Sequence, residues 1–243
     1  MHIIKLDATD STNTYLKGLQ QRNELEDFTT VVTREQSKGK GQMGASWESE
    51  PGKNLTFSTL KKFNNLPVPE GFLLNICTSL AVLNALKQFS IPNLRVKWPN
   101  DILSGNVKIC GILIENILFG NQIKTSILGI GLNVNQISFP TVSKATSMKL
   151  LLGPTFDLDA VRKSIIEELK KLFFLIEEKQ YGLLRKTYEQ ELFRINKPST
   201  FKNEKGDFFM GFIRGVSTHG KLLVELEDAI LKEFDLKQIR LLY

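Results

Sequence analysis

The sequence contains very little cysteine and histidine, and this removes several classes of site at the outset. Among its 243 residues there are two cysteines and two histidines. Cys77 and Cys110 both lie inside apolar runs, so we expect buried free thiols in a reducing compartment rather than a disulfide framework. His2 and His219 are expected to be incidental, and no His/Cys/carboxylate spacing indicates a metal site.

Long apolar runs are missing as well. No stretch reaches the roughly 18 uninterrupted apolar residues of a membrane-spanning helix, and the first residues lack the apolar core of a signal peptide. We therefore expect no membrane partner and a cytoplasmic location. The chain is 42% hydrophobic and 24% charged, which is an ordinary globular composition and excludes disordered or collagen-like proteins.

The charge is mildly unbalanced towards lysine and arginine. Thirty-two basic and 26 acidic residues give a net charge of +6. Two interpretations stay open at this point: an evenly charged surface, or attraction to an acidic partner or a phosphorylated ligand.

Apolar spacing divides the chain into a large first part and a small second part. We predict strands at 2–7, 28–36, 55–63 and 94–102 (the last running into a loop), a β-hairpin from 107–118 and 122–134, and helices at 11–22, 69–90, 157–179 and 181–194. The pattern changes near Asn196, after which five short strands predict a small β-barrel. The expected domains are therefore 1–195 and 196–243.

A glycine-rich segment, Gly-Lys-Gly-Gln-Met-Gly at 39–44, matches the letters of a dinucleotide-binding fingerprint but not its context. No helix pattern follows it, and about twenty residues on stand Lys61 and Lys62 rather than an acid. It is not a Walker loop, because no G-K-[ST] closes it. The segment is either a surface turn or a mobile loop in which glycine N–H groups and Lys40 surround an anion.

Three further fragments concentrate polar side chains at strand ends. The segment 95–101 (RVKWPND) is either an edge strand entering a proline turn or a binding segment. Lys108 opens an apolar strand, where an isolated lysine normally extends its ammonium group to solvent. In 129–135 (GIGLNVN) the glycines indicate a bulge or the close approach of a ligand, and Asn133 offers a donor and an acceptor of the kind that binds an adenine edge.

Together, and in this order, the fragments resemble the biotin protein ligases (biotin–acetyl-CoA-carboxylase ligases). The series comprises D-S-T-N at 10–13, Gln36 with the glycine loop and Trp47, K-W-P-N-D at 97–101, K-I-C-G-I-L-I-E at 108–115 and G-I-G-L-N-V-N at 129–135. The resemblance covers essentially the whole chain. It implies an α+β fold with a mixed β-sheet packed with helices, like that of class II aminoacyl-tRNA synthetases and biotin/lipoate ligases, plus a small C-terminal SH3-like β-barrel.

The resemblance also implies a biotin site in the first domain. The family holds the ureido ring of biotin with D-S-T-N and the glutamine before the loop, which here are Ser11, Thr12 and Gln36. A cyclic urea has one strong acceptor and two N–H donors, which hydroxyls and an amide can satisfy. Gly39 and Gly111 would let the backbone approach the ligand.

The catalytic and nucleotide-binding residues follow from the same resemblance. Lys108 would neutralise the biotin carboxylate and the α-phosphate, with Lys40 as the second catalytic cation. The family loop usually reads G-R-G-R, so Gln42 stands here in place of a cation. Trp47, Asn100 and Asn133 would surround the adenosine.

The reaction so implied consumes ATP, with Mg²⁺ arriving on the triphosphate, and uses biotin as substrate. Biotin is activated as biotinyl-5′-AMP and passed to a lysine of a biotin carboxyl carrier protein. The D-S-T-N motif begins at residue 10, so we expect no preceding helix-turn-helix and no specific DNA binding. The alternatives are a lipoate or octanoate ligase or transferase of the same superfamily, or a non-catalytic biotin- or nucleotide-binding module.

Overall fold

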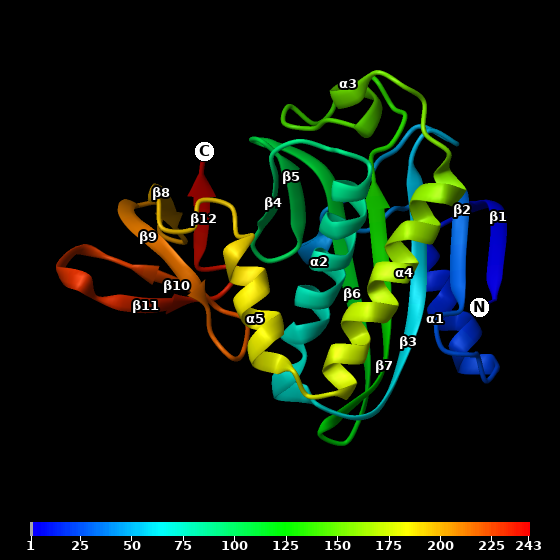
Figure 1. Ribbon diagram of the computed structural model, residues 1–243, viewed down its shortest axis with the longest axis horizontal. Coiled ribbons are helices and arrows are strands. Elements are labelled where there is room, and N and C mark those ends of the chain that lie inside the picture. The colour runs from blue at the N-terminus through cyan, green and yellow to red at the C-terminus, as the bar shows by residue number, and fades with distance from the viewer. Residues whose placement is uncertain (1) are drawn as a thin grey trace.

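A mixed, seven-stranded sheet forms the centre of the molecule (Figure 1). The computed structural model describes residues 2–243. The strand order is β1-β2-β3-β7-β6-β5-β4, and only the β1–β2 pair is parallel. The strands are β1 (Ile3–Thr9), β2 (Thr30–Gln36), β3 (Leu55–Pro67), β4 (Leu94–Lys97), β5 (Asp101–Ser104), β6 (Val107–Phe119) and β7 (Gln122–Leu132).

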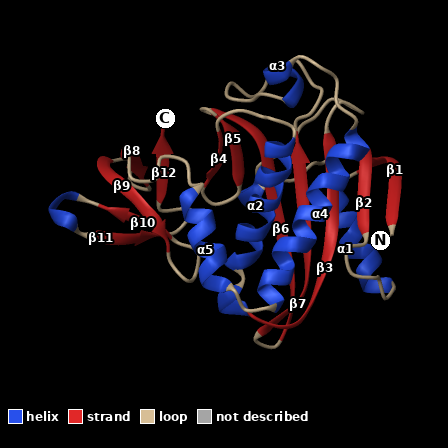
Figure 2. Ribbon diagram, in the orientation of Figure 1, coloured by secondary structure: helices blue, strands red, loops and turns tan. Residues whose placement is uncertain are grey.

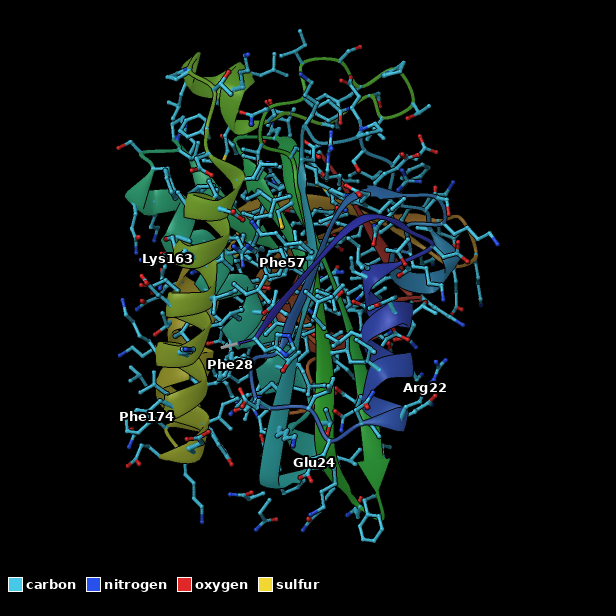
Figure 3. All side chains as sticks on the ribbon, turned by 90° about the vertical axis from the view of Figure 1, so that its right-hand side faces the viewer. Arg22, Glu24, Phe28, Phe57, Lys163 and Phe174 are labelled. Atoms are coloured by element: carbon cyan, nitrogen blue, oxygen red, sulfur yellow. The ribbon has the colours of Figure 1, made fainter. Side chains whose placement is uncertain are left out.

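Helices cover both faces of this sheet, and each face has its own core. In Figure 3 the sheet lies between α4 and α1, and Figure 2 shows α2, α4 and α5 side by side on one face. The other face packs on α1 through a small cluster of Leu16, Val31, Leu60 and Ile127. The helices are α1 (Thr12–Arg22), α2 (Phe72–Gln88), α3 (Met148–Leu152), α4 (Leu158–Glu177) and α5 (Tyr181–Gln190), with short 3₁₀ turns at Gln42–Gly44, Val68–Glu70 and Glu227–Ala229.

The α2 helix is apolar on almost every side because it packs between the sheet and the helices α4 and α5. By length and composition alone Val68–Gln88 could cross a membrane, with a hydropathy of 1.3, although 61% of that window is buried inside the protein. The sequence predicts a long buried helix at 69–90, and the structure places α2 there. Its apolar character is accounted for by the core that it fills.

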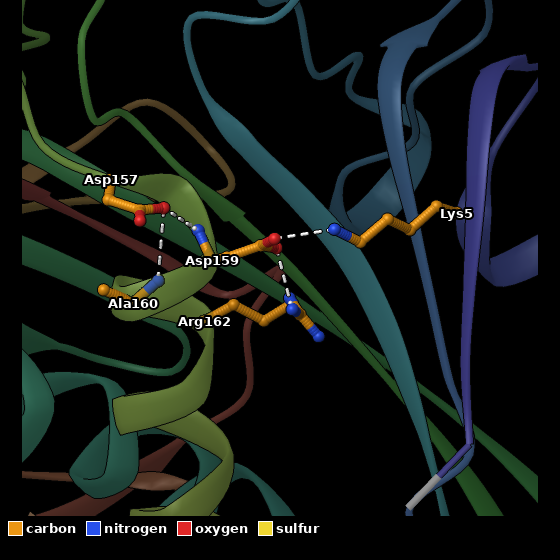
Figure 4. A network of polar contacts seen from close by, with 5 residues as sticks. All are labelled: Lys5, Asp157, Asp159, Ala160 and Arg162. Carbon is orange, nitrogen blue, oxygen red and sulfur yellow. Dashed lines mark hydrogen bonds and ion pairs between the residues drawn. The ribbon is translucent and has the colours of Figure 1, made fainter.

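The α4 helix begins at a capped and charge-paired end (Figure 4). Asp157 Oδ1 accepts hydrogen bonds from the backbone N–H groups of Asp159 and Ala160, as expected for an N-cap aspartate. The Asp159 carboxylate contacts Lys5 Nζ at 2.6 Å and Arg162 Nη2 at 2.7 Å. These bonds tie the edge strand β1 to the helix layer, and they lower the pKa of Asp159.

The last part of the chain forms a separate antiparallel sheet. Its strands are β8 (Pro198–Asn203), β9 (Phe208–Val216), β10 (Leu222–Glu225), β11 (Leu231–Phe234) and β12 (Ile239–Leu242), in the order β11-β10-β9-β8-β12. This arrangement is consistent with the expected SH3-like barrel, and the predicted α+β fold is confirmed. The division at 195/196 stays a prediction; the first strand of the second sheet begins at Pro198.

Trp98 and Glu189 make two of the polar contacts that hold the second sheet against the first domain. Trp98 Nε1 donates to the carbonyl of Gly220 at 2.8 Å, and Glu189 accepts from the backbone N–H of Val216 at 3.0 Å. A Cβ atom at Gly220 would overlap the ring of Phe72, so glycine permits this close approach. The segment 95–101 therefore anchors the small domain as well as contributing to the site described below.

One predicted strand is wrong in its extent. The segment 94–102 was expected as a single strand running into a loop, but β4 ends at Lys97 and β5 begins at Asp101. The chain turns at Trp98–Asn100, where Pro99 has no backbone N–H to give to a ladder. The two short strands then pair antiparallel, which brings Lys97 opposite Asp101.

Candidate active site

A pocket of about 240 Å³ opens on the α1 face of the sheet. Its floor is the backbone of β6 and β7. At the positions where side chains of these strands would point towards α1, the sequence has glycine. Gly111 of β6 lies opposite Gly131 of β7, and Gly129 lies opposite Leu113. A Cβ atom at Gly131 would overlap the Trp47 indole, and one at Gly129 would overlap the Asn13 side chain. The motif glycines therefore leave a bare strip of backbone between two strands.

The glycine-rich loop covers this strip. It turns back on itself through a Lys40–Ser46 bridge and a hydrogen bond from Trp47 N to Gly39 O at 2.9 Å. A Cβ atom at Gly39 would overlap the carbonyl of Trp47, so glycine is needed for the loop to close on itself. After this turn the side chain of Trp47 lies on the floor of the pocket, and its buried Nε1 has no hydrogen-bond partner among the described residues.

The first turn of α1 and the end of β2 supply a cluster of hydroxyl and amide groups. Ser11 and Thr12 are buried, and Gln36 Oε1 accepts from the backbone N–H of Thr12 at 2.8 Å. Ser11 occupies the N-cap position of α1, yet its side chain makes no capping bond. All three line the pocket. This part of the site is polar, desolvated and without formal charge.

A cationic group lies elsewhere on the pocket wall. Lys108 Nζ is 2.6 Å from Asp101 Oδ1 and 5.6 Å from the centre of the Trp47 ring. Lys97 Nζ approaches the other oxygen of Asp101 at 3.6 Å. Lys40 Nζ donates to Thr14 Oγ1 at 3.0 Å. The wall thus carries more positive than negative charge, which suits an anion.

A second cavity of about 640 Å³ adjoins the first, between the sheet and the C-terminal domain. The residues that line both cavities are Gln42, Asn100, Asp101 and Lys108. The second cavity adds three cations, which are Lys97, Lys144 and Arg240. Ser11, Thr12 and Gln36 line only the first cavity, so the polar uncharged cluster and the cationic junction are distinct parts of one site.

The tyrosine and cysteine nearest the site are kept in their neutral forms by burial. Burial raises the pKa of Tyr243, and the Asp101 carboxylate raises it further. Burial also raises the pKa of the Cys110 thiol far above its ordinary value, despite the opposing effect of Lys108. Cys110 is therefore no nucleophile.

The predicted site residues come together with two exceptions. Those that line the first pocket are Ser11, Thr12, Gln36, Lys40, Gln42, Trp47, Asn100, Lys108 and Gly111. Gly39 lies at the start of the loop, packed against the carbonyl of Trp47, and is not among the described lining residues. Asn133 is buried, and its Nδ2 donates to the carbonyl of Thr146 at 3.0 Å, outside the described lining. The individual roles of all these residues stay predictions.

Several lining residues were not assigned a role from the sequence. Asp101 and Asn13 stand inside the motifs already quoted, so a signal existed for both. The amide of Asn100 donates to the carbonyl of Ile112, which ties the turn to β6. Thr56 of β3 lines the pocket although no motif marks it.

Comparison with known proteins identifies the family to which this geometry belongs. Residues 6–133 match the model of the biotin/lipoate A/B protein ligase family. The chain is a member of that family. The match begins within β1 and runs to the end of β7.

Individual relatives agree with this assignment. The biotin protein ligase of Aquifex aeolicus, solved in complex with biotin and ATP, superposes with a TM-score of 0.81 at 26% identity over 99% of this chain and 98% of that one. The bifunctional ligase/repressor BirA of Bacillus spizizenii is 28% identical over 235 residues, which are 95% of this chain and 71% of the relative. The biotin–[acetyl-CoA-carboxylase] ligase of Paracoccus denitrificans is 32% identical over 136 residues, covering 53% of each protein.

Proposed function

We propose that the protein is an ATP-dependent biotin ligase that forms biotinyl-5′-AMP and transfers the biotinyl group to a lysine of a biotin carboxyl carrier protein. The observation that carries this proposal is the pair of joined cavities. A small desolvated cavity with a neutral polar cluster meets a larger basic one at Lys108 and Asp101. Such a site suits a neutral ring with an acidic tail beside a polyphosphate.

In the first step the biotin carboxylate attacks the α-phosphorus of ATP, and pyrophosphate leaves. Ser11, Thr12 and Gln36 bind the ureido ring and so orient the carboxylate towards the junction. Negative charge develops on the α-phosphate oxygens there, and Lys108 and Lys40 stabilise it. Lys108 Nζ contacts Asp101 at 2.6 Å, and an ammonium group has further N–H donors with which to bind the phosphate.

In the second step the ε-amine of the carrier lysine attacks the acyl carbon of the mixed anhydride. The new C–N bond forms, the C–O bond to phosphate breaks, AMP leaves and the amine releases its proton. The loop of residues 39–47 covers the floor of the pocket and excludes water from the anhydride. The nucleophile belongs to the acceptor protein, so the site needs none of its own.

We propose that Mg²⁺ enters bound to the ATP phosphates. The described residues hold no group of three potential ligands of the His, Cys, Asp or Glu type. Asp101 lines both cavities and offers one carboxylate, which fits the usual preference of Mg²⁺ for phosphates, water and one or two carboxylates. The ion would screen the triphosphate charge during displacement.

The acceptor and the compartment are also proposals. A relative such as the Paracoccus denitrificans ligase is named for acetyl-CoA carboxylase, so we propose a carboxylase carrier domain as the acceptor. A cytoplasmic location is supported by two buried cysteines that are both free thiols.

The direct test is mass spectrometry of a carrier domain incubated with the protein, biotin and MgATP. A ligase adds one biotinyl group to the carrier lysine, and it also catalyses biotin-dependent exchange of pyrophosphate into ATP. Binding of biotin without exchange would indicate a binding module instead. Faster transfer of lipoate than of biotin would indicate a lipoate ligase.

A further inference from the structure

A hydrogen-bonded chain leads from the half-buried Glu115 through the buried side chains of Asn13 and Ser58 to the hydroxyl of Thr12. Asn13 Nδ2 donates to Glu115 Oε2 at 2.8 Å and to the carbonyl of Leu113 at 3.3 Å. The Ser58 hydroxyl lies 2.6 Å from Asn13 Oδ1 and 2.7 Å from Thr12 Oγ1. Ser58 is fully buried, and the described lining of the pocket includes Thr12 and Asn13 but neither Ser58 nor Glu115.

The chemistry of the groups fixes the direction of every bond in this chain. A carboxylate and a carbonyl can only accept, so the Asn13 amide presents its NH₂ to Glu115 and its oxygen to Ser58. Ser58 carries a single hydroxyl proton, and that proton goes to the amide oxygen. The 2.7 Å contact with Thr12 therefore needs the proton of Thr12, which donates to Ser58.

A competing arrangement is less favourable. Thr12 Oγ1 also lies 3.1 Å from Gln36 Oε1 and could donate there. The Thr12 and Ser58 oxygens would then face each other at 2.7 Å with no hydrogen between them. The shorter contact therefore takes the proton, and the lone pairs of Thr12 remain for the ligand.

The neighbouring amide is fixed in the same way. Gln36 Oε1 accepts from the backbone N–H of Thr12 at 2.8 Å, so the amide has its Nε2 donors available for other partners. Thr12 thus presents an acceptor beside a Gln36 donor. A ligand that complements this pair has an N–H donor next to a carbonyl acceptor, as a cyclic urea does and a dithiolane ring does not.

We propose that Ser58 and Glu115 are positioning residues that set Thr12 as a hydrogen-bond acceptor and thereby select the N–H of the biotin ring over rings without one. The proposal rests on the biotin ligase function proposed above. It assigns a role to the buried Ser58 and the half-buried Glu115, which both lie outside the described pocket lining.

The first test is the dissociation constant for biotin without ATP, measured by calorimetry. In Ser58→Ala the hydroxyl proton of Thr12 loses its partner and can point towards the ligand. We therefore expect the dissociation constant for biotin to rise roughly 5- to 20-fold, the range for one misaligned hydrogen bond. Ser126→Ala is the matched control, because the buried Ser126 also donates to an asparagine oxygen, that of Asn116 at 2.8 Å. That variant should bind biotin like the parent.

A double-mutant cycle distinguishes an effect through the hydrogen-bonded chain (the relay from Glu115 through Asn13 and Ser58 to Thr12) from a general effect of Ser58 on packing. In a Thr12→Val background the relay has no hydroxyl to orient, so adding Ser58→Ala should cost less than about 2-fold more. Desthiobiotin retains the ureido ring, so Ser58→Ala should weaken its binding by the same factor as for biotin. A full, additive loss in the cycle would mean that Ser58 only supports the fold, and the proposal would be wrong.

Glu115 supplies a second, independent pair of variants. Glu115→Leu should weaken biotin binding as Ser58→Ala does, whereas Glu115→Gln keeps an acceptor oxygen for Asn13 and should recover most of the affinity. Parent affinity in both Ser58→Ala and Glu115→Leu would overturn the relay while leaving the ligase function intact. A parent protein that binds no biotin would instead overturn the proposed function itself.

Discussion

Replacing Lys108 with alanine tests the catalytic assignment most directly, because its effects on rate and on stability are expected to differ greatly in size. The Lys108 side chain is 31% exposed and its partner Asp101 is 18% exposed. A partly exposed ion pair contributes about 1 kcal/mol or less to stability. The Asp101 carboxylate also keeps Lys97 at 3.6 Å after the substitution, so no buried charge is left without a partner.

The expected loss of stability is therefore small. For a chain of this length, about 1 kcal/mol corresponds to a fall of roughly 2–4 °C in Tm. The catalytic loss should be larger, because removing one preorganised charge from a developing oxyanion typically costs about 10²–10³ in rate. Lys108→Arg keeps the positive charge but changes the shape of the side chain, so it shows whether the charge alone is sufficient.

The assay is biotin-dependent exchange of pyrophosphate into ATP, run beside thermal unfolding of the same preparations. We expect Lys108→Ala to unfold near the parent temperature while exchange falls by about two to three orders of magnitude. Exchange at the parent rate would refute the catalytic assignment. A large fall in Tm would mean that Lys108 is chiefly a structural partner of Asp101.

Three further predictions concern the loop, the floor and the helix layer. Residues 38–52 should be cleaved more slowly by protease once biotin and ATP are added. Lys40→Ala should speed the release of preformed biotinyl-5′-AMP about 10- to 100-fold, and Gln42→Arg should slow that release. Equal cleavage with and without ligands, together with unchanged release in both variants, would show that the loop is a static turn. Gly131→Ala should displace the Trp47 indole, which its methyl group would overlap, and a tryptophan fluorescence spectrum identical to the parent's would contradict this. Asp159→Asn should lower Tm at neutral pH by the equivalent of about 1 kcal/mol or more: the contact with Lys5 is largely exposed and contributes little, but Arg162 is only 6% exposed and loses its carboxylate partner. Because bonds from Lys5 and Arg162 lower the pKa of Asp159, its stabilisation is present above the ordinary carboxyl pKa and is lost as pH falls through the lowered one, so parent and variant should converge in acid.

Most of the fold could be predicted from local signals. The hairpin of β6 and β7 and the amphipathic α4 helix follow from apolar spacing, and the C-terminal strands follow from alternation and turns. The β4–β5 hairpin was missed because each strand has only four residues, too few to show a period. The short α3 helix gave no periodic signal for the same reason.

The site could be predicted only as far as its motifs extended. Lys108, Gln36 and the loop stand in recognisable series, and the structure gathers them around one pocket. Asn133 belongs to such a series too, yet it lies outside the described pocket lining and its Nδ2 donates to the carbonyl of Thr146. The sequence shows which chemical groups a motif contains. It does not show which partner each group contacts, because that depends on segments that are distant in the sequence.

Gly129 illustrates that dependence on distant contacts. Its sequence context left a bulge and the close approach of a ligand as the two alternatives. In the structure Gly129 pairs with Ser58 in an unbroken register between Leu55 and Lys62, so no bulge is present there. The room left by its missing side chain is filled by Asn13, whose oxygen a Cβ atom would overlap. The glycine therefore serves the hydrogen-bonded chain that orients Thr12, and the neighbour that explains it is separated from it by more than a hundred residues of sequence.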